Sequence, residues 1–223
     1  MPRPAKRTER TGLSHQAICR AALALIDKHG LAAFSTRKLG AALGCEAMAI
    51  YWYYPSKDAL LDAVIDHLIG DLAVDTAPTD WVAALRAVAH AYRRIAHDHR
   101  NAFPLLTTRR FASEGSYGFL EQLFALARSH GLDDRTIARF YRIVSSYCNG
   151  FALDELAPPL PKNAALRKQH PRVTAVMKWL EPRYLDDIFE LGLEIQLAAI
   201  TSQRAAEPRA PGRQTSSVSE KKA

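Results

Sequence analysis

The 223-residue chain has few cysteines and no long apolar run. Cys19, Cys45 and Cys148 lie far apart and form no C-x-x-C pair, which argues against a disulfide framework and against a zinc site. No uninterrupted apolar stretch approaches the roughly 20 residues that a membrane-spanning helix needs, and the N-terminal segment MPRPAKRTER lacks the apolar core of a signal peptide. We therefore expect a cytoplasmic protein with reduced thiols, no membrane partner, no metal and no cofactor.

The common catalytic signatures are also missing. The chain contains no G-x-G-x-x-G, no G-x-x-x-x-G-K-S/T, no H-E-x-x-H and no G-x-S-x-G. His90, His97 and His99 form the only metal-like cluster, and we interpret them as polar residues near a helix end. An enzyme is therefore not expected, although a helical enzyme stays open as a less favoured alternative.

Positive charge is concentrated near the N-terminus. The formal net charge is +7, and residues 1–62 hold nine basic and five acidic residues. A local excess of this kind suits a polyanionic partner such as nucleic acid. The first residues, with Arg3, Lys6, Arg7 and Arg10, could lie along DNA or could simply be a solubilising tail.

Apolar residues recur every three or four positions along most of the chain, and no period-two alternation lasts long enough to indicate a sheet. Ser14, Ser35 and Ser56 can each cap a helix, Gly30 can end the first in a left-handed conformation, and Gly44 stops the second. A third short helix is expected over 46–53, and Pro55 must interrupt the helical pattern after it. Four helices with a glycine-containing turn between the second and third are typical of a helix-turn-helix DNA-binding unit.

The helical pattern resumes after TAPTD, and further helices are expected over 81–98, 102–109, 116–130, 133–156 and 181–206. The segment APPLPKN between the last two reads as a proline-rich loop. The tail from residue 207 is too poor in apolar residues to fold. The expected fold class is therefore all-α.

The stretch FSTRKLGAALGCEAMAIYWYYPSKDALLDAV resembles the DNA-binding domain of the TetR family of transcriptional regulators, over about residues 13–72. More weakly, DHRNAFPLLTTRR and YCNGFALDE resemble the effector-binding half of tetracycline repressors. The resemblance implies an N-terminal three-helix helix-turn-helix domain, joined through a fourth helix to a larger helical domain that binds a ligand and dimerises. The implied division is a basic flexible arm over 1–12, a DNA-binding domain over 13–56, a ligand-binding and dimerisation domain over 57–206, and a disordered tail over 207–223.

The resemblance also implies roles on the DNA. Tyr51 and Lys57, at the family's tyrosine and lysine positions, would contact phosphates, while Arg37 could donate two hydrogen bonds to a guanine. Base reading would fall to four residues of the recognition helix, Ala47, Met48, Ala49 and Tyr53. Thr36 completes the expected DNA-binding set, whereas Ile50 and Tyr54 would pack inward and Trp52 is assigned to packing.

The last helix is apolar around nearly its whole circumference, so one face must pack within the domain and another against something else. A partner subunit is the economical candidate. The resemblance implies a four-helix dimer interface, which also suits a palindromic double-stranded DNA operator. The residues expected at this homodimer interface are Val144, Cys148, Phe151, Ile188, Ile195 and Ala199.

The expected effector site is apolar. Ala73, Val88 and Leu106 stand where tetracycline repressors hold drug and magnesium, so tetracycline is not expected as the effector. The candidate ligand-binding residues are Tyr92, Phe103, Leu106, Arg109, Arg110 and Phe124, which favour an apolar or aromatic molecule, or an anionic one if an arginine points inward. The sequence thus predicts a ligand-responsive regulator, a repressor, that a small hydrophobic effector releases from DNA. A constitutive DNA-binding protein without ligand control remains an alternative.

Overall fold

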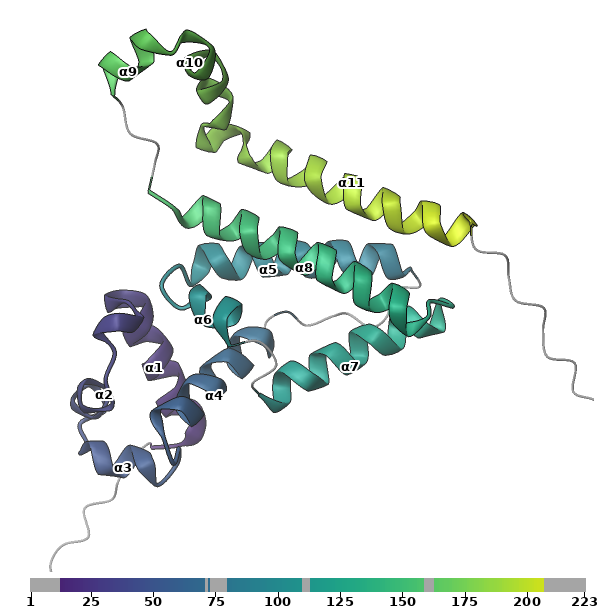
Figure 1. Cartoon of the computed structure of the whole chain (residues 1–223). Helices are drawn as coiled ribbons and strands as arrows, with labels where there is room; N and C mark the ends of the chain where they lie inside the picture. Colours follow the sequence, from purple (N-terminus) through teal and green to yellow (C-terminus); the bar gives the residue numbers. More distant parts are fainter. Residues whose placement is uncertain (1–12, 71, 73–79, 110–112, 159–162, 207–223) are drawn as a thin grey trace, which may run out of the picture.

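The computed structural model describes residues 13–70, 72, 80–109, 113–158 and 163–206. These ranges contain helices, turns and loops but no strand, which confirms the all-α expectation (Figure 1). The basic arm 1–12 and the tail 207–223 lie outside the described residues, so the expectations about them stay predictions.

A small N-terminal bundle, called the headpiece below, contains α1 (His15–His29), the 3₁₀ turn η1 (Leu31–Ala33), α2 (Thr36–Leu43) and α3 (Ala47–Tyr51). The expected caps are confirmed, because the hydroxyl oxygens of Ser14 and Ser35 accept hydrogen bonds from the backbone amides of Ala17 and Lys38. Gly44 ends α2 in the left-handed conformation, with φ 66° and ψ 29°. Gly30 differs from the expectation: its φ is 80° but its ψ is 156°, since the chain leaves α1 in an extended direction before η1.

The turn between α2 and α3 depends on Gly40. The Cys45 amide donates to the Gly40 carbonyl at 2.9 Å, and a Cβ on residue 40 would lie 2.7 Å from the Cys45 carbonyl oxygen. A side chain there would collide with the backbone of the turn, so glycine is what lets the two helices approach so closely.

The next helix, α4 (Lys57–Gly70), begins at Ser56, whose hydroxyl oxygen accepts from the Ala59 amide at 3.0 Å. Its buried side chains, among them Leu60, Val64 and Leu68, belong to one apolar cluster with α1–α3 and with residues of α5 and α6. The headpiece and the larger domain therefore share one apolar core, and α4 contributes to it.

The larger domain contains α5 (Trp81–Asp98), α6 (Phe103–Thr108), α7 (Glu114–Ser129), α8 (Asp134–Leu156) and α11 (Leu185–Ala206). All five lie within a few residues of the expected ranges. The long helices α8 and α11 run side by side in opposite directions across α5 (Figure 1). A second apolar cluster joins α5, α7, α8 and α11 and includes Trp81, Phe140 and Phe189.

Two short helices between α8 and α11 were not expected. They are α9 (Ala164–Gln169) and α10 (Pro171–Met177), followed by the 3₁₀ turns η2 (Lys178–Leu180) and η3 (Pro182–Tyr184). They stand away from the rest of the domain (Figure 1) and bury none of their residues, so no apolar periodicity marks them. The usable signals were Asn163, which caps α9, and Pro171 in the first turn of α10.

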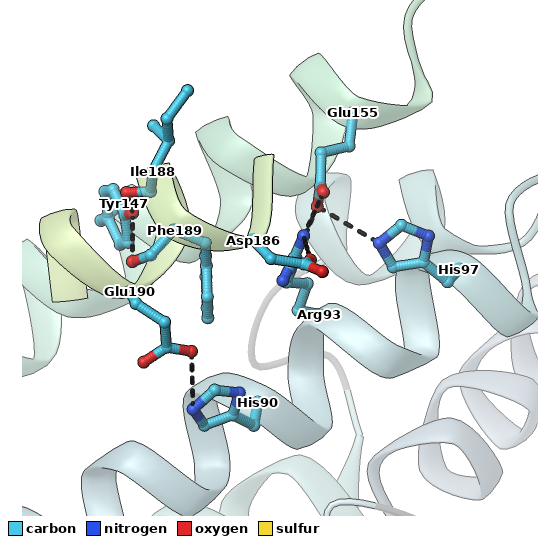
Figure 2. Close-up of polar contacts among 9 residues, drawn as sticks. All are labelled: His90, Arg93, His97, Tyr147, Glu155, Asp186, Ile188, Phe189 and Glu190. Atoms are coloured by element: carbon cyan, nitrogen blue, oxygen red, sulfur yellow. Dashed lines mark hydrogen bonds and ion pairs between the residues drawn. The ribbon is translucent and has the colours of Figure 1, made fainter. Parts of the chain in front are cut away.

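A polar junction ties α11 to α5 and α8 (Figure 2). The Arg93 guanidinium on α5 donates to Glu155 at 2.9 and 2.5 Å and to Asp186 at 2.7 Å, and it lies over the Phe189 ring. The bond to Glu155 is the largest cause of the raised pKa of Arg93. The Tyr147 hydroxyl donates to the Phe189 carbonyl, and burial raises the pKa of this phenol to about 12.

Candidate nucleic-acid interface and ligand cavity

The helix-turn-helix presents an exposed face of mixed chemistry. Met48 is 66% exposed and Tyr51 37%, and Arg37 on α2 is exposed as well. The hydroxyl oxygens of Thr36 and Tyr51 lie 3.2 Å apart, so a hydrogen bond between them links the start of α2 to the end of α3. Ala47, at the start of α3, is partly exposed. This face combines a guanidinium, a phenol and apolar groups. The guanidinium and the phenol can donate hydrogen bonds to phosphates or to guanine, and the apolar groups can contact thymine methyl groups.

Two of the expected base readers do not lie on this face. Ala49 is only 8% exposed and packs inside the headpiece. Tyr53 is half-buried: its hydroxyl donates to the Leu13 carbonyl at 3.1 Å, and its ring meets the His15 ring edge-on. The burial of Ala49 differs from its expected outward position, whereas base reading by the partly exposed Tyr53 stays a prediction.

Trp52 was expected to pack, and this expectation is wrong, because its side chain is 86% exposed. Trp52 follows Met48 by four residues, so it lies on the exposed face of α3. The amides of Tyr53 and Tyr54 both donate to the Ile50 carbonyl where α3 ends. Ile50 and Tyr54 are buried as expected.

Lys57 opens α4 beside this face. Its side chain is exposed, and its ammonium group donates to the Phe34 carbonyl at 3.3 Å while lying 5.5 Å from the centre of the Phe34 ring. Lys38 is held in a similar way, by a 2.8 Å hydrogen bond to the Ala33 carbonyl. Both ammonium groups are thus anchored through carbonyl oxygens.

A cavity of about 120 Å³ lies in the larger domain, among α4, α5, α6, α7 and α8. Three of the expected ligand-binding residues, Tyr92, Leu106 and Arg109, line it. Phe103 does not: it is fully buried and meets the Tyr92 ring edge-on. Phe124 is not in the lining either and packs against Tyr141. Arg110 lies outside the described residues.

Arg109 does not offer an unpaired charge to the cavity. Its guanidinium donates to Asp58 at 2.9 Å and to Asp62 at 3.1 Å, and both carboxylates belong to α4. The hydrogen bond to Asp58 is the largest cause of the raised pKa of Arg109. The pairing argues against the anion-binding role suggested for an inward arginine and instead ties α6 to α4.

Two residues expected at a dimer interface belong to the cavity instead. Val144 and Cys148 are 6% and 5% exposed and line it, because the face of α8 that carries them points inward. Burial raises the pKa of the Cys148 thiol to about 12, so this thiol is protonated at neutral pH. Phe151 was also expected at the dimer interface, but it packs against Phe189 within the domain.

The outward faces of α8 and α11 carry apolar side chains. Ile195 is 64% exposed, Leu191 63% and Ile143 51%, and Ala199 is exposed too. Ile188 is half-buried at the edge of this surface. The expected interface residues on α11 therefore lie on or beside an exposed apolar face.

A polar contact between the headpiece and the larger domain has no counterpart in the sequence analysis. His99, at the end of α5, lies 2.7 Å from the Asp27 carboxylate on α1, and the Asn101 amide donates to the Asp27 carbonyl at 2.7 Å. Asn149 was also missed. It lines the cavity and accepts a hydrogen bond from the Tyr92 hydroxyl at 2.5 Å. A single amide within the apolar run YCNGFAL was the available signal.

In the ranges that the structure describes, no group of three or more metal-ligating side chains occurs. His90 and His97 instead face carboxylates, at 3.2 Å from Glu190 and 3.3 Å from Glu155 (Figure 2). Within the same ranges, no helix has both the length and the apolar character to cross a membrane.

Comparisons with known proteins agree with this arrangement. An HTH-type transcriptional regulator of Saccharopolyspora erythraea is 30% identical over 140 residues, which are 62% of this chain and 59% of that protein. The class G tetracycline repressor of Vibrio anguillarum is 25% identical over 88% of this chain and 97% of its own. A crystal structure of BioQ with its natural double-stranded DNA operator is 25% identical, with a TM-score of 0.62 over 86% of this chain and 99% of that one.

Family models match both parts of the chain. Residues 18–64 match the N-terminal model described as bacterial regulatory proteins, tetR family. Residues 75–204 match the tetracyclin repressor-like C-terminal domain, which covers more than half of the chain. The chain therefore belongs to the tetR family of bacterial regulatory proteins.

Proposed function

We propose that this protein is a ligand-responsive transcriptional repressor, not an enzyme, that binds a palindromic double-stranded DNA operator as a homodimer and is released by a small hydrophobic effector. One observation carries the proposal: α4 belongs to the core of the headpiece on one side and lines the cavity with Ile65 and Ile69 on the other. A ligand in the cavity therefore touches the helix that positions the DNA-binding surface.

The DNA-binding surface would comprise Arg37, Met48, Tyr51, Trp52 and Lys57. Arg37 is suited to guanine and Lys57 to phosphate, while the hydrogen bond with Thr36 holds the Tyr51 phenol in place. Ala47 is small enough to let the DNA approach the start of α3. BioQ, which shares the fold, has been solved with its operator, and this supports DNA as the partner.

Homodimerisation would use the outward faces of α8 and α11, with Ile188, Ile195 and Ala199 at the contact. Exposed apolar side chains grouped on two adjacent helices support an interface of this kind. A two-fold symmetric dimer presents two recognition helices, as a palindromic operator requires. We retain 13–56 as the DNA-binding domain and 57–206 as the ligand-binding and dimerisation domain, with α4 as the connection.

The effector would differ from a metal-bound tetracycline, although a tetracycline repressor is among the relatives. Val88 and Leu106, which replace metal or drug ligands in the resemblance, both line the cavity and offer no coordinating atom. Ala73, the third such position, lies outside the described residues.

Operator selection from random duplexes, followed by footprinting, tests the DNA-binding half of the proposal. We expect an inverted repeat, bound by a dimer and more tightly than unrelated DNA. A thermal-shift screen of hydrophobic compounds then finds ligands by linkage, and each ligand is tested for weakening of the operator complex. Specific operator binding that no bound ligand weakens would favour the constitutive alternative, and the absence of sequence-specific binding would contradict the proposal altogether.

A further inference from the structure

The cavity contains one buried amide with unused hydrogen-bonding capacity. Asn149 on α8 is 8% exposed, and its Oδ1 accepts from the Tyr92 hydroxyl. For its Nδ2 group no hydrogen-bond partner occurs among the residues that the structure describes. Asn149 lines the cavity, so its N–H groups are available to a bound molecule. The Nδ2 group keeps accessible surface toward the cavity, so a ligand oxygen placed there could accept a hydrogen bond from it.

The other walls of the cavity are mostly apolar and include rings. Ile65, Leu85, Val88 and Phe119 are among the lining residues, and the Tyr141 ring is another. Ser145 contributes a hydroxyl that already donates to the Arg142 carbonyl on its own helix. These walls suit a hydrophobic, ring-containing molecule that carries few polar atoms.

Charge at the cavity disfavours an anion. Arg109 is the charged residue in the lining, and its one positive charge faces the two carboxylates of Asp58 and Asp62. A ligand carboxylate would approach a group whose charges already sum to a negative value, and it would lose hydration against apolar walls. A neutral molecule meets neither cost.

We propose that the cavity binds a neutral aromatic ketone or quinone whose carbonyl oxygen accepts a hydrogen bond from the Asn149 amide. Asn149 is then the residue that selects a carbonyl over a hydrocarbon, and Tyr92 holds it in place through the bond to Oδ1. The inference rests on the proposed function, in which this cavity is the effector site, and it specifies the chemical class of the effector.

Three matched probes test it on the full chain by calorimetry: 2-acetylnaphthalene, 2-ethylnaphthalene and 2-naphthoate. They share one ring system and differ in having a neutral carbonyl, no polar atom or a negative charge. We expect the ketone to bind about tenfold more tightly than the hydrocarbon, as one net hydrogen bond allows, and the carboxylate to bind least. This comparison uses the wild-type protein and does not depend on any variant folding.

The variant Asn149→Leu should abolish the preference for the ketone, because it keeps the size of the side chain and removes the donor. Ser145→Ala is the matched control: it removes a lining polar group that is already hydrogen-bonded, so the preference should stay about tenfold. Circular dichroism and operator binding confirm that each variant is folded.

Several results would overturn the inference: equal affinities for the ketone and the hydrocarbon, tightest binding of 2-naphthoate, binding of none of the three, or an unchanged preference in Asn149→Leu. Operator binding is measured on the same samples. If it is sequence-specific while the probes fail to discriminate, the inference alone is wrong. Loss of sequence-specific DNA binding in the wild type would instead refute the proposed function.

Discussion

The headpiece and the larger domain are stabilised in different ways. In the headpiece, α1 and α2 begin at serine caps and end at Gly30 and Gly44, so neighbouring residues in the sequence satisfy these helix ends. In the larger domain, α5, α7 and α8 also begin at side-chain caps, but helices of up to 23 residues are held in addition by polar contacts between distant segments, such as Arg93 with Glu155 and Asp186, and they enclose a cavity. A locally determined unit suits a rigid reading surface, and an assembly of long helices around a void suits a ligand-dependent one.

The two regions are nevertheless coupled. They share an apolar cluster, Arg109 on α6 binds Asp58 and Asp62 on the connecting helix α4, and both His99 and Asn101 contact Asp27 on α1. A change in the cavity can therefore reach the headpiece through α4 or through α1. Allosteric control requires that the ligand prefer one of the two resulting arrangements.

The largest expected effect concerns the proposed dimer interface on α11, and it should change assembly without unfolding the headpiece. Ile195→Asp places a carboxylate in the proposed dimer interface, and an uncompensated buried charge costs about 3–5 kcal/mol. We expect monomers in sedimentation experiments, with headpiece helicity retained. Tyr117→Asp on α7 is the matched control, since both side chains are 64% exposed in the single chain, and it should stay dimeric. A folded, dimeric Ile195→Asp protein would rule out this interface.

The next effect tests whether the larger domain depends on its long-range polar contacts. Glu155 is 3% exposed, so Glu155→Gln leaves Arg93 with only the exposed Asp186 as a carboxylate partner and should lower the free energy of unfolding by about 3 kcal/mol. Asp186→Asn removes a carboxylate that is 89% exposed and should change it by less than about 1 kcal/mol. Chemical denaturation measures both, and equal effects would mean that burial of the pair is not what stabilises the domain.

The same contrast explains what could be predicted from the sequence. Ser14, Ser35 and Ser56 act on amides three residues away, so the starts of α1, α2 and α4 could be inferred locally. The exposure of Trp52 could have been inferred in the same way, because helical spacing places it on the face of Met48, away from the buried Ile50.

In the larger domain the local signals were ambiguous. Val144 and Cys148 lie on a helix that is apolar on more than one face, so periodicity could not distinguish cavity from interface. The partners of Arg109 are about 50 residues away in the sequence, and no local pattern indicates such a pairing. The cavity could therefore be predicted as apolar, but its lining could not be resolved residue by residue.

On the proposed DNA-binding surface, Arg37 and Lys57 should differ in kind. Arg37→Ala should cost about 1–3 kcal/mol on the preferred operator and little on a site altered at the contacted base pair. Lys57→Ala should weaken all sequences alike and flatten the plot of log affinity against log salt by about one unit per lost phosphate contact, hence about two for a dimer. Titrations on matched and mismatched operators at several salt concentrations measure both. If Arg37→Ala weakens both operators equally while Lys57→Ala removes discrimination, the two roles are exchanged.

The smallest expected effect concerns the contact between the two regions at Asp27. The side chains of His99 and Asp27 are 24% and 28% exposed, so their pairing is partly screened and should be worth only about 0.5–1 kcal/mol. Asp27→Asn removes the charge and keeps the shape, while the bond from Asn101 to the Asp27 backbone carbonyl remains. Native-state hydrogen exchange should therefore show lower protection in the last turn of α1 by that amount, with α8 and α11 unchanged. Asp98→Asn, at an exposed acid one residue before His99, is the control and should alter neither region. Equal exchange in Asp27→Asn and the wild type would leave α4, with its bonds to Arg109, as the connection between cavity and headpiece that the described contacts support.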